Sequence, residues 1–328
     1  MESKSWRFDV NVLLIFFVRD DVFSKTFAAV KEARPRRLLL FQDGAREGRA
    51  DDIEGIRKCR EIAMDIDWDC ELYTNFQEAN IGCDPATFYS HKWAFSLVDK
   101  CIILEDDCLP SLSFFPFCEE LLAKYENDTR INRICGMNSL ESSESCPYDY
   151  FFADAGSVWG WATWKRVADL WEEDYGFTDD SYSMKLLRQN KPDKTYTRVI
   201  NKCLSHKKTA KPYWESINTY GRLLNSQLVI IPKYNLISNI GTTQNATHVM
   251  ADIRVLPRRV KRLFFMKTFQ YEFPLKSPKY VVCDSNYRKL IQLGGAKDKI
   301  ESIWLRIRYG HIKQLWGALM RKLINVGK

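Results

Sequence analysis

The sequence has no apolar run long enough to cross a membrane. Its longest fully apolar stretch covers residues 12–18, seven residues in all, whereas a membrane-spanning helix needs about 20. A charged-then-apolar secretory signal is also missing, because residues 1–9 are polar and lead directly into that run. We therefore expect a cytoplasmic protein, with a peripheral position on the inner face of the cell membrane as the alternative.

CxxC pairs are missing as well. None of the ten cysteines forms one, and several lie inside apolar, strand-like runs such as CIIL at residues 101–104. This pattern is typical of buried, reduced thiols in a cytoplasmic protein. Hydrophobic residues make up 45% of the 328-residue chain, which indicates a globular protein with one large core or two modest ones.

Acidic side chains are scarce at the C-terminal end. From residue 254 onward 18 Lys and Arg accompany four Asp and Glu, whereas the first 253 residues carry 31 Lys and Arg and 38 Asp and Glu. An acidic body with a basic end predicts two functional parts. We expect a catalytic domain over residues 1–250 and a basic C-terminal helical appendage over residues 251–328.

Strand-like and helix-like patterns alternate through the first 140 residues. Strands are predicted at residues 10–18, 38–41, 70–74, 101–104 and 133–137, and helices at 23–33, 51–66, 87–98 and 114–125. This alternation predicts an α/β fold with a mostly parallel sheet that helices cover on both faces. Farther on, residues 148–171 are rich in tryptophan, 183–219 are mostly helical, and 228–232 form a short strand.

Polar loops follow the ends of four predicted strands. They cover residues 19–20, 42–44, 75–82 and 105–107. Because ligands of such sheets bind beyond the carboxyl ends of the strands, we expect these loops to meet at one crevice.

Three adjacent carboxylates, Glu105, Asp106 and Asp107, follow the apolar strand 101–104. Like charges held this close together are costly without a counter-charge. A divalent cation with phosphate ligands supplies that charge, since Mg²⁺ or Mn²⁺ typically binds one or two carboxylates plus substrate phosphates. Capping of the helix that starts near Ser113 is the alternative, and it explains one acid rather than three.

The segment IILEDDCLPSLSFFPFCEELLAKY, residues 102–125, resembles the DxD segment of GT-A glycosyltransferases. It is most similar to the bacterial hemolysin-like nucleotide-diphospho-sugar transferases, and at this motif to the N-acetylglucosaminyltransferase I type. Four more segments agree in order: LLLFQDGAREG, IDWDCELYTNFQEANIGC, GSVWGWATWKR and NLISNIGTTQNATH. The resemblance spans about residues 10–248 and implies a Rossmann-like donor half over residues 1–140 and an acceptor half over residues 141–250.

The resemblance also implies roles for individual residues. The implied metal ligands are Asp107 and His248; the implied donor-binding residues are Arg19, Asp43, Asn80, Gly82, Glu105 and Asp106; the implied acceptor-binding residues are Trp159, Gly160 and Trp161. Each has a structural alternative: Asp43-Gly44 is also a turn dipeptide, and tryptophans are often core residues. His248 lies in a polar loop, which favours a ligand role.

The residues that would supply the catalytic base match the family pattern least closely. An inverting transfer needs a carboxylate within reach of the acceptor hydroxyl. The family pattern TWDYQW places an Asp after a Trp, and PYWESINTY offers Glu215 instead; Asp154 is the second candidate. The chain also has Val18-Arg19-Asp20 where the family has Asn-Arg-Pro, and Asn245 where it has an acid. These departures concern the identity of the donor more than the reaction.

The basic end contains an amphipathic helix pattern. Leucine, isoleucine and aromatic residues recur on one face at positions 305, 309, 312, 316, 319 and 323, with Lys and Arg on the other sides. This pattern favours a helix lying on an anionic membrane surface. Packing against the catalytic domain is the alternative.

Together these features predict a glycosyltransferase that requires Mn²⁺ or Mg²⁺. It would move a sugar from a nucleoside diphosphate donor, UDP-linked by preference, to a saccharide or lipid-linked acceptor, with inversion, in bacterial surface polysaccharide synthesis. A sugar-nucleotide nucleotidyltransferase and a non-catalytic glycan- or membrane-binding protein are the alternatives. The nucleotide-sugar motifs make a nucleic-acid partner unnecessary.

Overall fold

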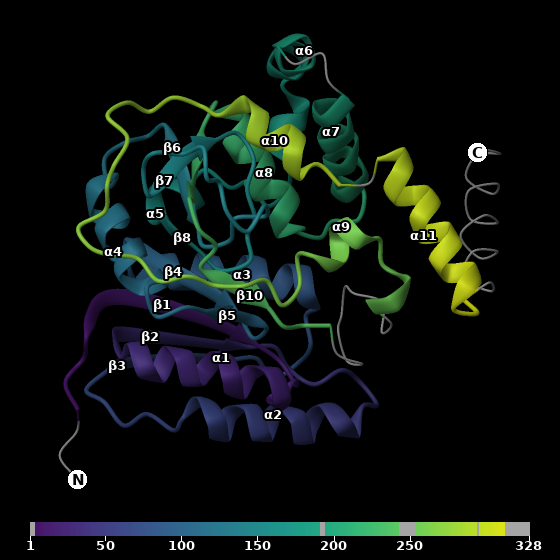
Figure 1. Ribbon diagram of the computed structural model, residues 1–328. Helices are drawn as coiled ribbons and strands as arrows, with labels where there is room; N and C mark the ends of the chain where they lie inside the picture. Colours follow the sequence, from purple (N-terminus) through teal and green to yellow (C-terminus); the bar gives the residue numbers. More distant parts are fainter. Residues whose placement is uncertain (1–3, 191–193, 243–252, 294, 312–328) are drawn as a thin grey trace.

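An eight-stranded sheet in the order β3-β2-β1-β4-β8-β6-β9-β7 forms the centre of the protein (Figure 1). The computed structural model describes residues 4–190, 194–242, 253–293 and 295–311. The strands are β1 (Phe8–Phe16), β2 (Pro35–Gln42), β3 (Glu71–Phe76), β4 (Lys100–Glu105), β6 (Ile131–Cys135), β7 (Tyr150–Ala153), β8 (Trp161–Trp164) and β9 (Leu228–Pro232). Only β8 and β7 run against the others. The expected α/β class with a mostly parallel sheet is confirmed.

The described chain has eleven α-helices, and several of them cover one face or the other of this sheet. They are α1 (Asp20–Ala33), α2 (Ala50–Ala63), α3 (Cys83–Leu97), α4 (Phe114–Lys124), α5 (Lys165–Ala168), α6 (Ser181–Asn190), α7 (Lys194–Lys207), α8 (Trp214–Leu224), α9 (Arg258–Lys261), α10 (Ser285–Ile291) and α11 (Ala296–Arg308). Two short 3₁₀ turns, η1 (Gly176–Asp179) and η2 (Ile253–Val255), and a small ribbon of β5 (Cys108–Pro110) with β10 (Ile237–Asn239) complete the described chain.

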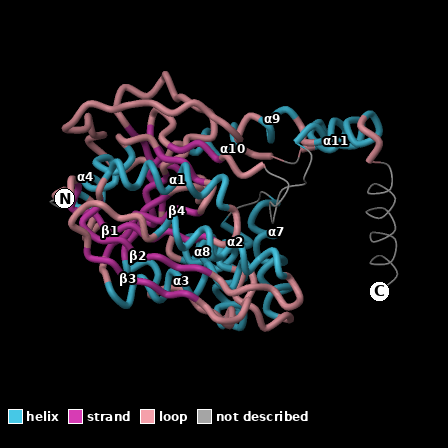
Figure 2. The backbone as a smooth tube through the Cα atoms, turned by 90° about the horizontal axis from the view of Figure 1, so that it is seen from below, coloured by secondary structure: helices cyan, strands magenta, loops and turns pink. Residues whose placement is uncertain are grey.

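Alternation along the strands divides the core into two layers. Leu14 and Leu40 point to the layer that α1, α2 and α4 cover, whereas Leu13 and Leu39 point to the layer that α3 and α8 cover. Because successive side chains of a strand point to opposite faces, fully apolar strands bury both faces at once. The layered arrangement is visible from below in Figure 2.

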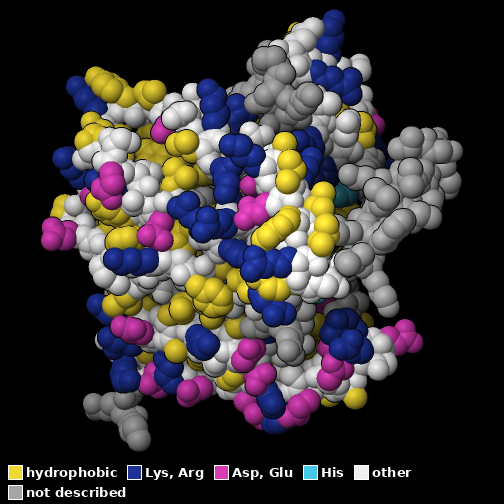
Figure 3. Space-filling view, turned by 45° about the vertical axis from the view of Figure 1, so that its right-hand side comes forward, with side chains coloured by type: hydrophobic (Ala, Val, Ile, Leu, Met, Phe, Trp, Pro, Cys, Tyr) yellow, Lys and Arg dark blue, Asp and Glu magenta, His cyan; other side chains and the backbone are white. Residues whose placement is uncertain are grey.

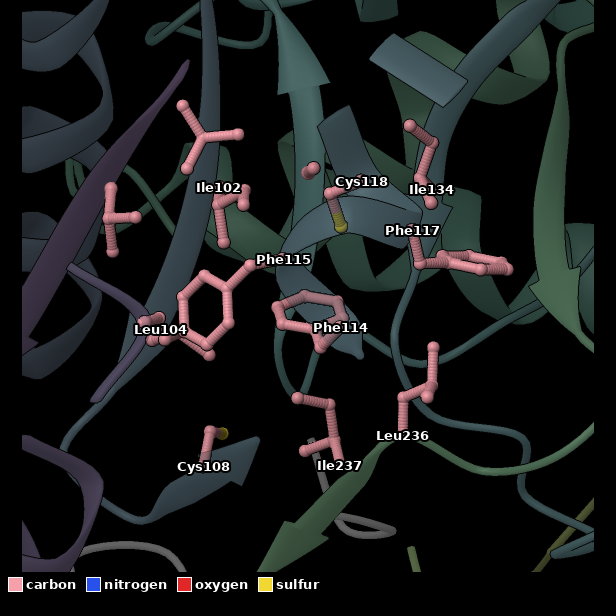
Figure 4. Packing of buried hydrophobic residues seen from close by; sticks show 14 of the residues in the cluster. Ile102, Leu104, Cys108, Phe114, Phe115, Phe117, Cys118, Ile134, Leu236 and Ile237 are labelled. Carbon is pink, nitrogen blue, oxygen red and sulfur yellow. The ribbon is translucent and has the colours of Figure 1, made fainter. Parts of the chain in front are cut away.

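The end of β4 is held by an aromatic group from α4. Figure 4 shows Phe114 and Phe115 packed beside Leu104 of β4, with Ile237 of β10 below them. Burying a phenylalanine contributes about 1.5–3 kcal/mol relative to leaving it exposed. This packing fixes the point at which β4 ends, and with it the acidic residues that follow.

The tryptophan-rich segment contributes two strands to the sheet. β8 lies antiparallel between β4 and β6, so that Trp161 is level with Ile103 and Cys135. Residues 148–171 are therefore part of the core rather than a solvent loop, as their composition indicates.

The region after residue 250 shares the same core. Phe264, Met266 and Leu275 are at most 7% exposed, and Tyr287 packs under β7 and β9. The boundary that we expect near residue 250 therefore does not separate two cores. None of the described helices is long and apolar enough to cross a membrane.

Candidate functional site

The carboxyl ends of β1, β2, β3 and β4 meet at one edge of the sheet. Ile15 is level with Glu105, and Gln42 lies between Phe16 and Phe76. The predicted polar loops therefore start from neighbouring points, as expected from their positions in the sequence.

Arg19 lies between two carboxylates of the acidic triplet. Its Nε donates to Asp106 Oδ2 at 3.2 Å, and its Nη2 donates to Asp107 Oδ2 at 2.9 Å and to Asp106 Oδ1. Its Nη1 lies 3.4 Å from the carbonyl oxygen of Gly241. The side chains of all three paired residues are less than 15% exposed. Arg19 thus acts as the internal counter-ion of the triplet.

One guanidinium does not neutralise three carboxylates. Burial raises the pKa of Glu105 well above its usual value, and the charges of Asp107, Asp106 and Glu215 raise it further. Burial also raises the pKa of Asp106, although Arg19 opposes this shift. Burial alone would lower the pKa of Arg19, but the two aspartates raise it overall. Without a further cation, the pKa values of Glu105 and Asp106 are therefore shifted toward the protonated, neutral forms.

Asp107 is enclosed by the backbone that follows β10. Asn239 Nδ2 donates to its Oδ1 at 3.2 Å, and the backbone N–H of Ile240 donates to its carbonyl oxygen at 2.9 Å. A Cβ on Gly241 would lie 2.0 Å from Asp107 Oδ2. Asn239 and Gly241 thus contact the acidic triplet although no sequence pattern above identifies them. The glycine two residues after the short strand 237–239 is the signal that could have indicated them.

Asp43 organises a loop. Its carboxylate accepts hydrogen bonds from the backbone N–H groups of Gly44, Ile81 and Gly82 and from Asn80 Nδ2, at 2.9 to 3.1 Å. Burial raises its pKa, and the backbone hydrogen bonds oppose that shift. The structure brings the predicted donor residues Asp43, Asn80 and Gly82 together, and both carboxylate oxygens are already used within the chain. A ribose contact through Asp43 stays a prediction.

Glu215 is exposed in the first turn of α8. Its position follows from the residue before it: Trp214 stacks on Trp161 of β8, with ring centroids 5.9 Å apart, and both rings contact His91. The charge of Glu215, at the start of α8, is one of the causes that raise the pKa of buried Glu105. The structure therefore places the first candidate base near the triplet.

The predicted acceptor residues divide into different environments. Trp161 is 1% exposed, so its assignment to acceptor binding is corrected: it is a core residue that supports Trp214. Gly160 has φ of +60°, and a Cβ there would lie 2.4 Å from Ile237 Cδ1, so only glycine fits. Trp159 is half-buried and its ring centroid lies 5.3 Å from that of Phe264. Trp159 alone of the three keeps an accessible side chain.

Asp154 is not brought to the site. It follows β7, which runs antiparallel to β9, so it lies at the opposite edge of the sheet from Glu105. There its Oδ2 pairs with Arg288 Nε at 3.4 Å. Its assignment as the second candidate base is therefore corrected. His248, the predicted second metal ligand, lies outside the described residues.

The triplet suits a divalent cation in charge and in donor chemistry. Within the described ranges no group of three His, Cys, Asp or Glu side chains is arranged to hold a metal ion. Asp107 would therefore suit a cation that takes most of its ligands from phosphate and water, as Mg²⁺ commonly does. Such a cation would share Asp107 Oδ2 with Arg19 or displace it.

Comparisons with known proteins add little. No protein-family model and no curated protein sequence matches the chain. Among solved structures, the chain is similar to UDP-glucose pyrophosphorylase complexed with UDP-glucose, at a TM-score of 0.33 and 9% identity, over 69% of this chain and 91% of that one. A similarity this weak carries no argument about activity. The strand order, and not this similarity, places the protein among α/β folds with a mostly parallel central sheet.

Proposed function

We propose that the protein is a GT-A glycosyltransferase that moves a sugar from a nucleoside diphosphate donor to a saccharide or lipid-linked acceptor, with UDP as the preferred nucleotide. The observation that carries this proposal is the acidic triplet at the carboxyl end of β4, which has one arginine for three carboxylates. A diphosphate brought there by a cation would contact Arg19, and the cation would contact the carboxylate oxygens.

Three residues would have separate roles in this reaction. Asp107 would hold Mn²⁺ or Mg²⁺, which neutralises the charge of a departing diphosphate when it is bound. Arg19 would turn from its aspartate partners toward the phosphates. Glu215 would accept the proton of the acceptor hydroxyl as that oxygen bonds to the anomeric carbon and the bond to the diphosphate breaks.

A nucleotidyltransferase that makes sugar nucleotides is the main alternative. Such enzymes usually have a glycine-rich loop with a basic residue after the first strand. Here β1 ends at Phe16 and α1 begins at Asp20, and the three residues between them include no glycine. This connection leaves little backbone to surround a triphosphate, which favours sugar transfer. Incubation with UTP and a sugar 1-phosphate should therefore release no pyrophosphate.

Thermal unfolding in the presence of UDP, GDP and CMP, each with and without Mn²⁺, tests the donor site. A ligand that binds the folded state at 100 times its Kd adds about 2.7 kcal/mol to stability. We expect a rise in Tm for one nucleotide, with UDP first, that requires Mn²⁺. Equal shifts without metal would contradict the role of Asp107, and no shift with any nucleotide would contradict the donor site.

Asp107→Asn should abolish Mn²⁺-dependent release of UDP from a UDP-sugar while the protein stays folded. The amide keeps the size of the side chain but loses the charge that a cation needs. Asp169→Asn is the matched control, because Asp169 pairs with Lys165 at the surface of α5. Undiminished turnover in Asp107→Asn, measured beside this control, would rule out the metal assignment.

A further inference from the structure

Helix α11 exposes a strip of large apolar side chains to solvent. Ile300, Ile303, Trp304 and Ile307 are 68%, 49%, 52% and 54% exposed. Their spacing of three, one and three residues places them on one side of the helix, within about 100° of arc at 3.6 residues per turn. We call these four residues the α11 face. Figures 1 and 2 both show α11 projecting from the side of the body, away from the central sheet.

The opposite side of α11 holds the helix to the protein. Leu305 is 8% exposed, and the guanidinium of Arg254 in η2 lies over the ring of Tyr309, 5.2 Å from its centroid. The carboxylate of Glu301 accepts a hydrogen bond from the backbone N–H of Arg258 at 3.1 Å. Of the apolar positions that the sequence pattern assigns to a membrane, 305 therefore faces the body, and Tyr309 contacts Arg254 although it is 38% exposed. Positions 312–323 lie outside the described residues. The α11 face is a different surface.

Basic residues border the α11 face on both sides. At 100° per residue, Lys297 and Arg308 lie next to one edge of the face, and Lys299 and Arg306 lie next to the other. The two acids of the helix lie on the side of Leu305, and Asp298 is 5% exposed. The helix thus presents an apolar centre with positive borders, and its negative charges face inward.

The surrounding surface has the same character. Eleven of the 20 large hydrophobic residues exposed in the described chain lie between residues 265 and 309. Over residues 253–311 the sequence carries 14 Lys and Arg and four Asp and Glu. Figure 3 shows hydrophobic side chains beside Lys and Arg side chains on the side of the molecule that carries α11. Large exposed apolar patches with polar residues around them mark sites of interaction with proteins or membranes.

We propose that the α11 face binds the surface of a membrane rich in anionic lipids, with Trp304 and the three isoleucines among the acyl chains nearest the headgroups. Interfacial helices combine an apolar face with Lys and Arg beside it, and tryptophan is favoured at the headgroup level. Each basic side chain near an anionic leaflet adds attraction that salt weakens. This inference does not depend on sugar transfer, because it uses no residue of the acidic triplet.

Sedimentation of the full chain with lipid vesicles tests the proposal. Neutral phosphatidylcholine vesicles are compared with vesicles that also contain about 30% phosphatidylglycerol, an anionic lipid. We expect binding to the anionic vesicles at least tenfold tighter than to the neutral ones. Ile303→Ser/Ile307→Ser should weaken that binding at least tenfold, and Lys299→Gln/Arg306→Gln should weaken it severalfold and reduce its salt dependence.

Ile53→Ser/Leu97→Ser is the matched control, because these side chains are 64% and 45% exposed on α2 and in α3. This control should bind as the unchanged protein does, and circular dichroism should show that all variants are folded. Equal binding by the control and by Ile303→Ser/Ile307→Ser would overturn the proposal. A second outcome would also overturn the proposal: an RNA or DNA oligonucleotide that binds the isoleucine variant as well as the unchanged protein and prevents vesicles from binding. The surface would then be a general polyanion site.

The depth of Trp304 gives a second readout. Lipids brominated near the headgroup quench tryptophan fluorescence only at short range. We expect the quenching caused by such vesicles to be smaller in Trp304→Phe than in the unchanged protein, with sedimentation retained. Identical quenching in both would show that α11 does not enter the lipid layer and would overturn the proposed position of Trp304.

Discussion

Gly241 shows how a residue without a side chain can shape a charged site. Its α-carbon is so close to Asp107 that an added Cβ would lie 2.0 Å from Oδ2. A real Cβ must therefore move either the carboxylate or the backbone after β10. The same backbone supplies the carbonyl oxygen that lies 3.4 Å from Arg19. The geometry of the acidic triplet consequently depends on this glycine.

Gly241→Ala should remove the Mn²⁺-dependent rise in Tm with UDP and lower the free energy of unfolding by about 1–3 kcal/mol, the usual cost of overpacking. Gly295→Ala is the control, because no atom lies within 4 Å of the Cβ that it adds. Thermal and urea unfolding of both variants measure the two effects. A Gly241→Ala protein that binds nucleotide like the control would show that Asp107 can move without consequence.

His91 is buried among Trp161, Trp171 and Trp214, and burial lowers its pKa to about 3. An unfolded chain has a histidine pKa of about 6.5. Between these values the unfolded state binds a proton that the folded state does not, so stability falls as pH falls. The loss should be about 1.4 kcal/mol per pH unit below 6.5.

The His91→Phe protein should lack this component. Urea unfolding at pH 7, 6 and 5 would give the free energy of unfolding of both proteins as a function of pH. The difference between the two slopes measures the contribution of His91, since other groups titrate equally in both. At pH 7 the contribution of neutral His91 is nearly complete, so the difference must grow toward pH 5. Parallel pH profiles would mean that His91 takes up a proton while folded.

At the scale of elements, the sequence predicts the strands with regular apolar patterns well. The pattern at residues 228–232 matches β9 (Leu228–Pro232), and the pattern at 101–104 matches β4 within a residue at each end. β8 is missed, because WATW is a short aromatic segment with no alternation, and only its two neighbours in the sheet make it a strand. Long-range pairing of this kind leaves no local signal.

The candidate site also has features that can be predicted from local sequence and contacts that cannot. The three carboxylates and the polar loops can be predicted, because each follows a strand whose end is visible in the sequence. Arg19 pairs with Asp106 and Asp107, which lie 87 and 88 positions later in the sequence. Gly241 likewise contacts Asp107 from a distant segment of the chain. These contacts follow from strand register and backbone approach, which a single sequence does not specify.

β8 also supplies a test of the aromatic packing. Trp161→Ala should lower the free energy of unfolding by about 3–5 kcal/mol, as truncation of a buried tryptophan does. Trp159→Ala should cost less, because that ring is half-buried against Phe264. Urea unfolding of both variants gives the comparison. A larger loss for Trp159 would reverse the assignment of Trp161 to the core and of Trp159 to the accessible surface.

At the scale of the whole molecule, the described chain from residue 253 onward is bonded to the last strand of the sheet, β7, and to the β5–β10 ribbon. The backbone N–H of Asp284 donates to Phe152 of β7 at 2.7 Å, and that of Phe265 donates to Asn239 of β10 at 3.0 Å. Asn239 in turn holds Asp107. The basic region therefore supports the candidate site through β10, in addition to carrying the α11 face.

This connection predicts opposite results for two truncations. A chain that ends at residue 250 loses Phe264, Met266, Leu275 and Tyr287, each at most 7% exposed. Four buried side chains at about 2 kcal/mol each approach the whole stability of an ordinary domain, about 5–15 kcal/mol. A chain that ends at residue 292 keeps all four and loses α11, whose Leu305 and Asp298 are its buried residues. We expect the shorter protein to aggregate, and the longer one to unfold cooperatively with a Tm only a few degrees below that of the full chain. A soluble, cooperative 1–250 protein would instead show that the first 250 residues form an independent domain and that the later segment is only attached to its surface.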